Sequence, residues 1–137
     1  MAAKLIAFLA RYLGALGTGT TPENTGQCVG LVERWLAALG VGPIWGDAKD
    51  LLANADPRWY TVERNAPDNY PPPGAVVCWN ASWGAGHGHT AVVLAATRLH
   101  MAVFEQNDPT GALPLAATHG YAGVQGWLTV KAPKVTA

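Results

Sequence analysis

The sequence has few charged residues, and the charges that it does have cancel. Its 137 residues include nine Lys and Arg against nine Asp and Glu, which gives a formal net charge of zero. Charged residues make up 13% of the chain and apolar residues 50%, a balance typical of a compact globular protein rather than a disordered one. Without an excess of positive charge, no long-range field favours binding to nucleic acid or to an anionic membrane. Any substrate must therefore be bound through local contacts.

Cysteine is scarce as well, because the chain has only Cys28 and Cys78. Two cysteines cannot build the disulfide framework that stabilises many small secreted domains. A chain of this length can bury a sufficient core without such bonds. One pair could still form, but a cysteine that acts in catalysis must stay free.

Long apolar runs are also missing, since no stretch approaches the roughly 20 residues needed to cross a bilayer. The segment 1–17 is largely apolar, but Arg11 interrupts it and no small-residue cleavage site follows, which argues against a signal peptide. Its larger apolar side chains recur at helical spacing: Leu5, Leu9, Tyr12, Leu13 and Leu16. This segment is therefore predicted to be an amphipathic helix that packs on the domain.

Two more helices are predicted ahead of a series of strands. The segment 28–39 has one apolar stripe before Gly40, formed by Leu31, Val32, Trp35, Leu36 and Leu39. A shorter helix is predicted in 46–55, with Asp47 in its first turn. Runs of β-branched and aromatic residues predict strands at 59–63, 74–79, 89–96, 101–107 and 123–130. Helices followed by strands, with no repeat and no long linker, predict a single α+β domain over 1–137, in which an antiparallel sheet packs against the helix that begins at Cys28.

Cys28 is a candidate nucleophile because of its place at a helix N-terminus. The positive end of the helix dipole and the free backbone N–H groups favour a thiolate at such a position. A single cysteine there is more often a small buried side chain, so the interpretation needs partners for it. His89 follows the glycine-rich GAGHG and opens a predicted strand, which puts an imidazole at the edge of the sheet.

The run 101–107 adds two polar side chains to these candidates. Alternation along a strand puts four of its side chains on one face: Met101, Val103, Glu105 and Asn107. Phe104 and Gln106 point to the other face. A carboxylate and an amide at the end of an apolar face are unexpected in a core, although solvation at the strand end would also explain them. A thiol, an imidazole and a polar group that fixes the imidazole are together the parts of an activated nucleophile.

With these residues in this order, the sequence resembles the CHAP family, the cysteine- and histidine-dependent amidohydrolases and peptidases of phage endolysins and bacterial wall-remodelling enzymes. The matching segments are TGQCVGLVERWLAAL, PPPGAVVCW, GHGHTAVVLAA and VFEQN, which cover the greater part of the chain. The resemblance implies a papain-like α+β fold. It also implies a nucleophile, a base that later acts as an acid, a residue that orients the imidazole and an assisting fourth member: Cys28, His89, Glu105 and Asn107, respectively.

The substrate implied by the resemblance is an amide bond in the peptide part of bacterial peptidoglycan, either within the peptide or where it joins the glycan. The backbone N–H of Cys28 and the Gln27 side chain would form the oxyanion hole. Trp79, Ser82 and Trp83 would flank the substrate cleft, although core packing explains such tryptophans equally well. The expected partner is therefore peptidoglycan and not nucleic acid, and the protein is expected to be a monomer.

No metal ion or other cofactor is expected. Some members of the family carry a calcium site made by several Asp residues just before the nucleophile, but here Glu23 is the only carboxylate in the segment 17–27. Calcium takes six or more oxygen ligands, so the chain is expected to be calcium-independent. A zinc site is the alternative for four side chains: Cys28, Cys78, His87 and His89. Their spacing in the sequence lacks the paired ligands of recognised zinc motifs.

Two other roles are compatible with these residues. The same chemistry would serve a secreted or effector-type papain-like amidase, since the difference lies in delivery rather than in the site. A wall-binding module without catalysis is the other alternative, but binding needs no thiol beside an imidazole. The preferred prediction is a phage endolysin that is made in the host cytoplasm and acts on the bacterial cell wall.

Overall fold

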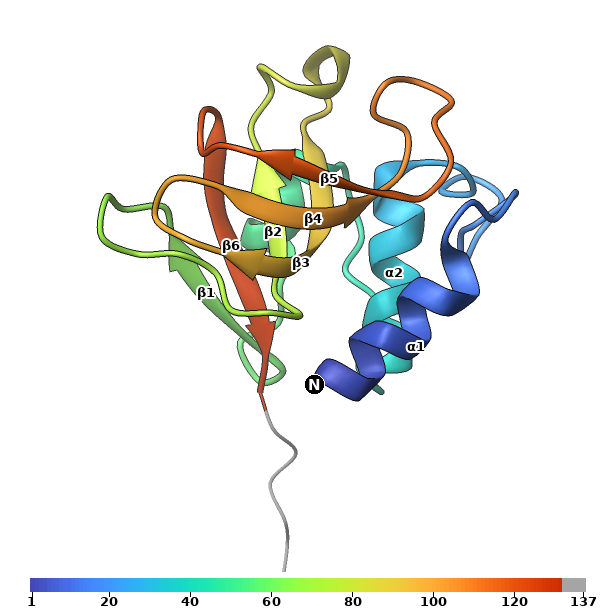
Figure 1. The fold of residues 1–137 in the computed structure, drawn as a ribbon, viewed down its shortest axis with the longest axis horizontal. Helices are drawn as coiled ribbons and strands as arrows, with labels where there is room; N and C mark the ends of the chain where they lie inside the picture. The colour runs from blue at the N-terminus through green and yellow to red at the C-terminus, as the bar shows by residue number, and fades with distance from the viewer. Residues whose placement is uncertain (132–137) are drawn as a thin grey trace, which may run out of the picture.

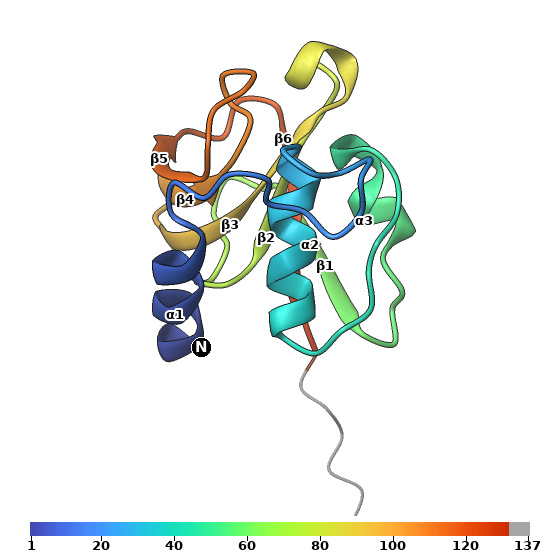
Figure 2. The same cartoon turned by 90° about the vertical axis from the view of Figure 1, so that its right-hand side faces the viewer.

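The computed structural model describes residues 1–131 and has its longer helices on one side of a curved sheet (Figures 1 and 2). The helices are α1 (Ala2–Tyr12), α2 (Cys28–Ala38) and α3 (Leu51–Asn54), with the 3-10 turns η1 (Ala48–Asp50) and η2 (Gly84–Gly86). The strands are β1 (Tyr60–Arg64), β2 (Val76–Trp79), β3 (His89–Ala96), β4 (Met101–Glu105), β5 (Leu115–His119) and β6 (Val124–Val130). They form one sheet in the order β1-β6-β2-β3-β4-β5, with every neighbouring pair antiparallel. The predicted α+β arrangement, with helices packed on an antiparallel sheet, is confirmed.

The sheet buries apolar side chains on both of its faces. The helix-side core, between the sheet and the helices, is built around Phe8, Trp35, Val76, Phe104 and Leu128. The far-side core, on the opposite face, is built around Val77, Trp79, Val93, Met101 and Trp127. The sheet curls so that β4 and β5 run across β2 and β6, which helps to enclose the far-side core (Figure 1). No helix in residues 1–131 combines the length and the apolar character that a bilayer crossing requires.

The helix α2 forms as predicted, and it packs mainly on β3. The buried stripe consists of Leu31, Val32, Trp35 and Leu36. At the C-terminal end Gly40 has a φ of 76° and donates its N–H to Ala37 O at 3.0 Å, while Val41 N–H donates to Leu36 O at 3.1 Å. These paired bonds form a Schellman cap, which explains why the helix stops at the predicted glycine.

The helix α1 also forms, but its apolar stripe differs from the predicted one. The side chains that pack on the helix-side core are Leu5, Phe8, Leu9 and Tyr12. Leu13 and Leu16 are exposed instead. The helix ends at Tyr12 and Gly14 takes a φ of 70°, so both leucines lie beyond the helix and no longer follow its periodicity. The prediction that Leu13 and Leu16 pack on the domain is therefore wrong.

All five predicted strands form, with ends shifted by no more than two residues from the expected bounds. Residues 46–55 hold the predicted short helix as η1 followed by α3. The strand β5 was not predicted; it is an edge strand whose side chains alternate between half-buried and exposed positions. One expectation fails at β4: the strand ends at Glu105, and Asn107 lies beyond it with a φ of 66°. Glu105 and Asn107 therefore do not share a strand face.

Candidate active site

Cys28 is the first residue of α2, and its half-buried side chain lines a cleft. The loop 18–27 that leads to it is held by Asn24, whose Oδ1 accepts the N–H groups of Thr20 and Thr21 at 2.8 and 3.0 Å. The helix lies so close to this loop that a Cβ at Gly30 would overlap the backbone oxygen of Asn24. The loop and the helix together fix Cys28 at a helix N-terminus, where the first N–H groups have no partner within the helix.

His89 and Glu105 lie together at one end of the sheet. His89 is the first residue of β3 and Glu105 is the last residue of β4, and antiparallel pairing brings these two ends together. His89 Nε2 lies 2.7 Å from Glu105 Oε2, and the two side chains are only 4% and 2% exposed. The Cys28 thiol lies near enough to the same imidazole to influence its protonation. Because Nε2 faces Glu105, Nδ1 is the ring nitrogen left for the thiol.

The electrostatics of this pair favour a charged imidazole. Burial lowers the pKa of His89, but the interactions with Cys28 and Glu105 outweigh it and raise the pKa to about 9. Burial raises the pKa of Glu105, yet hydrogen bonds from His89 and His119 hold that pKa below its usual value. At neutral pH the His89 ring is therefore held as an imidazolium beside the Glu105 carboxylate.

A second imidazole that the sequence did not indicate reaches the same carboxylate. His119 is the last residue of β5, and its Nε2 lies 3.0 Å from Glu105 Oε1 and 2.9 Å from Oε2. Asp108 Oδ2 lies 3.8 Å from the same ring nitrogen. No sequence signal pointed to His119, because the strand that carries it was itself not predicted.

Asn107 contacts a different residue from the one expected. Its Nδ2 donates to Gln27 Oε1 at 3.2 Å, and its Oδ1 accepts the N–H of Gly111 at 2.7 Å. Asn107 therefore orients the amide of Gln27. Because Gln27 Oε1 accepts this bond, the Gln27 amide presents its Nε2–H donors to other partners. Both Gln27 and Asn107 line the cleft.

Gln106, to which the sequence assigned only a strand face, connects the two halves of the site. Its side chain is buried, and its Nε2 donates to the backbone oxygens of Thr18 at 3.0 Å and Gln27 at 2.6 Å. These bonds tie the end of β4 to the loop that precedes α2. Gln106 thereby fixes the position of Cys28 relative to Glu105.

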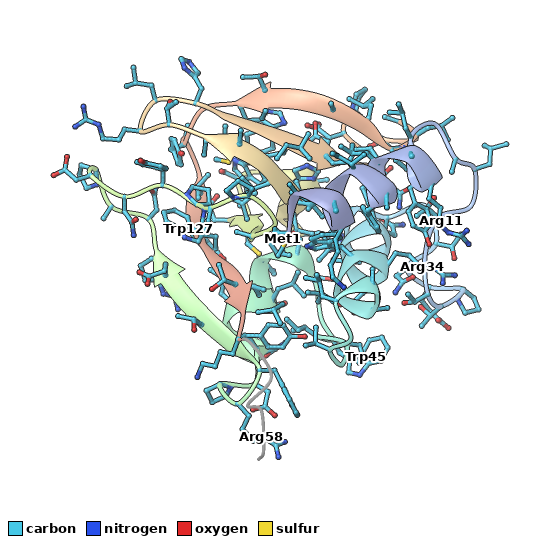
Figure 3. The ribbon with its side chains drawn as sticks, turned by 60° about the horizontal axis from the view of Figure 1, so that its bottom comes forward. Met1, Arg11, Arg34, Trp45, Arg58 and Trp127 are labelled. Carbon is cyan, nitrogen blue, oxygen red and sulfur yellow. The ribbon has the colours of Figure 1, made fainter. Side chains whose placement is uncertain are left out.

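The cleft beside these residues has a volume of about 1030 Å³. Cys28, His89 and Gln27 line one part of it, and Trp45 and Asp47 line another. Trp45 is 59% exposed, and Figure 3 shows it at the periphery of the molecule beside α2, whereas Trp127 lies among the side chains of the sheet. An exposed tryptophan on the cleft offers a surface on which a ligand can pack.

The three residues that were expected to flank the substrate cleft are not among those that line it: Trp79, Ser82 and Trp83. The Trp79 side chain is fully buried, with its ring 5.2 Å from that of His89. The Trp83 ring stacks on the His89 ring at 5.8 Å with an interplanar angle of 16°. Ser82 Oγ bonds to Asn80 Oδ1. The prediction is wrong for Trp79, which a substrate cannot reach, and the two indoles instead pack against the imidazole.

Cys78, one of the four side chains of the zinc alternative, does not line the cleft that the other three line. Cys78 belongs to the helix-side core, its Sγ lies 3.6 Å from Thr90 Oγ1, and burial raises its pKa to about 12. Within residues 1–131, side chains of the types that can bind a metal come together in a different set from the zinc alternative: His89, Glu105, Asp108 and His119. Their candidate ligand atoms lie within 4.8 Å of one another. Both imidazoles of this group already hydrogen-bond to Glu105. The geometry is that of N–H donors around a carboxylate.

The sequence matches the CHAP domain family over residues 18–107. It is 32% identical over 109 residues to the endolysin PlyTW of Staphylococcus phage Twort, an alignment that covers 72% of this chain and 23% of that protein. The solved structure of the wild-type endolysin LysIME-EF1 is similar at a TM-score of 0.71 and 23% identity, over 91% of this chain and 63% of that one. The structure of Ly7917, solved with the hydrolysing product of MDP, is similar at a TM-score of 0.67 and 20% identity, over 95% of this chain and 62% of that one.

These structural likenesses confirm the papain-like α+β fold. The chain spans about a quarter of the length of the curated relative and less than two thirds of each of the two solved chains.

Proposed function

The chain belongs to the CHAP domain family, and on this premise we propose that it is a peptidoglycan hydrolase with Cys28 as its nucleophile. The observation that carries the proposal is that Cys28 and His89 line the same cleft, with Glu105 hydrogen-bonded to His89. The relative from Staphylococcus phage Twort, which is named an endolysin, supports the same activity. On this proposal residues 1–137 act as one catalytic unit.

The first half of the reaction cleaves the amide. In the resting site the proton from the Cys28 thiol is already on His89 Nδ1, so Cys28 attacks as a thiolate while Nε2–H stays hydrogen-bonded to Glu105. The thiolate attacks the carbonyl carbon, and the electron pair of the C=O bond moves onto the oxygen. The backbone N–H of Cys28 and the Nε2–H of Gln27 donate to that oxygen, and such donors each stabilise the transition state by on the order of 3 kcal/mol. The C–N bond then breaks, and the imidazolium proton passes to the leaving amine.

The second half releases the acyl group. A water molecule gives a proton to His89 Nδ1 and attacks the thioester carbonyl carbon. The C–S bond breaks, the carboxylic acid leaves, and the released Cys28 thiolate is again paired with the His89 imidazolium. Glu105 remains ionised throughout, because its role is to orient the ring and stabilise its positive charge.

The bond that is cut belongs to the peptide part of the wall, in a cysteine endopeptidase or in an amidase that separates peptide from glycan. The cleft, which Trp45 also lines, has a volume of about 1030 Å³ and would offer room for a peptide segment in either case. Mass spectrometry of the fragments released from peptidoglycans of defined composition identifies the bond. As an endolysin, the protein would be made in the host cytoplasm and would act on the cell wall from inside.

Replacement of the nucleophile tests the proposal. We expect Cys28→Ala to abolish lysis of susceptible cell walls while binding to those walls persists, because only the attacking sulfur is lost. Turbidity of wall suspensions measures lysis, and co-sedimentation with walls measures binding. Cys78→Ala is the matched control and should lyse walls like the parent, provided that its melting curve shows a folded protein. A Cys28→Ala protein that clears walls as fast as the parent would refute the mechanism.

A further inference from the structure

The Glu105 carboxylate is shared between two imidazoles. His89 Nε2 contacts Oε2 at 2.7 Å, and His119 Nε2 contacts Oε2 at 2.9 Å and Oε1 at 3.0 Å. The Glu105 side chain is 2% exposed, so these contacts take the place of water. Within residues 1–131, no other side chain hydrogen-bonds to this carboxylate.

A buried carboxylate needs such donors for two reasons. An ionised carboxyl group that leaves water loses its hydration and must recover it through hydrogen bonds or opposite charge. A carboxylate with one partner can also rotate about its last side-chain bond, whereas two partners on different strands fix its plane. His89 comes from β3 and His119 from β5, so the two rings hold Glu105 from both neighbours of β4.

We propose that His119 is a positioning residue of the active site: its Nε2–H holds the Glu105 carboxylate in the orientation in which that carboxylate meets His89. The inference rests on the function proposed above, because it assigns His119 a role through Glu105. His119 itself touches neither the thiol nor the substrate in this role.

A purely structural role is the competing explanation. The His119 ring lies 5.4 Å from the Trp79 ring and 5.2 Å from the Trp83 ring, so it also contributes to an aromatic cluster. Packing requires the shape of the ring, whereas positioning requires its N–H donor. A side chain that keeps a donor but not the ring therefore separates the two roles.

The charged groups around this network define the expected pH effect. Glu105 faces His89 and His119, His119 also faces Asp108, and His89 faces Cys28. The hydrogen bond from His119 holds the pKa of Glu105 down, so loss of that donor raises it. Glu105 then takes up a proton at a higher pH, the imidazolium of His89 loses its counter-charge there, and the Cys28 thiolate is stabilised less.

The experiment compares His119→Leu, which removes the donor, with His119→Gln, which keeps an N–H donor. His100→Gln is the matched control, since His100 is exposed in the turn before β4. The readout is the rate of Cys28 alkylation by iodoacetamide against pH, which needs no wall substrate and is not confused by the buried Cys78. Wall lysis and the melting temperature are measured on the same samples.

We expect His119→Leu to move the acidic limb of the alkylation profile up by about 0.5 to 1 pH unit. Lysis should fall roughly tenfold, because part of the acid–base contribution is lost. In His119→Gln the acidic limb of the alkylation profile should stay at the pH of the parent, and most of the wall-lysis activity should remain. His100→Gln should match the parent in the alkylation profile, the wall lysis and the melting temperature.

The inference is overturned if His119→Leu leaves the alkylation profile unchanged, or if the Leu and Gln variants shift it equally. It is also overturned if both variants lose lysis and melting temperature together without a change in that profile, since the ring then acts by packing. A parent protein that fails to lyse walls, but whose alkylation profile still depends on the His119 donor, would refute the proposed function and support this inference.

Discussion

The protonation of His89 depends on the charge of one neighbouring side chain. In the parent protein, we expect the basic limb of the pH–rate profile near pH 9, where His89 loses its proton. In Glu105→Gln, an amide oxygen still accepts the Nε2–H, but no negative charge stabilises the imidazolium. The pKa of His89 then falls, and the basic limb should move down by about 1 pH unit or more. Hydrolysis rates measured from pH 6 to 10 locate this limb.

Glu63→Gln is the matched control for this change, because Glu63 is an exposed carboxylate on β1. Its profile should overlay that of the parent. A basic limb that stays in place in Glu105→Gln would show that Glu105 does not set the charge of His89.

The sequence pointed to His89 and Glu105, which hydrogen-bond, and to Cys28, which lines the same cleft as His89, whereas the other partners of Glu105 and of Gln27 could not be predicted. Alternation along a strand indicates the face of a side chain but not which group it touches across the sheet. His119 reaches Glu105 from another strand, and Asn107 leaves the strand through a positive φ that favours Asn among the non-glycine residues. Contacts of this kind depend on how the sheet curls, which a local pattern does not encode.

The contact between α2 and the loop 18–27 sets the position of Cys28, the proposed nucleophile, and Gly30 makes this contact possible. In Gly30→Ala the new Cβ would overlap the backbone oxygen of Asn24, and a backbone atom cannot swing aside as a flexible side chain can. Alanine improves helix propensity by about 1 kcal/mol, but such overpacking costs typically 1–3 kcal/mol and more when backbone must move. We expect a net loss of at least about 1 kcal/mol in the free energy of unfolding, together with reduced hydrolysis, because the loop shifts Gln27 and Cys28. Urea unfolding and hydrolysis rates measure the two effects.

Gly42→Ala makes the same chemical change where a Cβ would meet no atom within 4 Å. It should leave both the free energy of unfolding and the hydrolysis rate close to those of the parent. If the two variants unfolded at the same urea concentration, the helix would not be fitted to the loop as tightly as the coordinates indicate.

Elements with a strong local signal were predictable, and those without one were not. The apolar stripe of α2 ends at a glycine that closes a Schellman cap, so both its face and its end follow from the sequence. The β5 segment LAATH has no aromatic residue and one β-branched residue, and it is stabilised as a strand by pairing with β4. Tertiary pairing of this sort overrides weak local preference, which is why β5, and His119 with it, escaped prediction.

The presence of two cores follows from the central strand. The run VVCW in β2 is apolar at every position, and such a run indicates a strand buried on both faces. The sequence-based expectation placed only one face of the sheet against the helices. The far-side core is what surrounds His89, because Trp79 of that core packs against the imidazole. The second core therefore supplies the low-polarity environment in which the hydrogen bonds of Glu105 act most strongly.

The stability of the folded chain should depend on pH through Glu33, a buried carboxyl on α2 that accepts the Ile44 N–H at 3.2 Å. Burial raises its pKa from 4.5 to about 7 against the opposing effect of that hydrogen bond. Because the folded-state pKa is the higher one, the contribution to stability is complete below pH 4.5 and is lost as the pH rises to about 7. Glu33→Gln imitates the protonated carboxyl and still accepts the Ile44 N–H. Its free energy of unfolding should therefore equal that of the parent at pH 4 and exceed it by up to about 3 kcal/mol at pH 8.

Urea unfolding at several pH values measures this difference in the free energy of unfolding. Glu63→Gln, at an exposed position, is the control, and its difference from the parent should be the same at every pH. The other titrating groups cancel in the comparison, because contributions from sites that do not interact add independently in parent and variant. A Glu33→Gln curve that runs parallel to the parent from pH 4 to pH 8 would mean that burial does not hold a proton on Glu33. In that case the carboxylate must be solvated through the cleft that it lines, beside the proposed nucleophile.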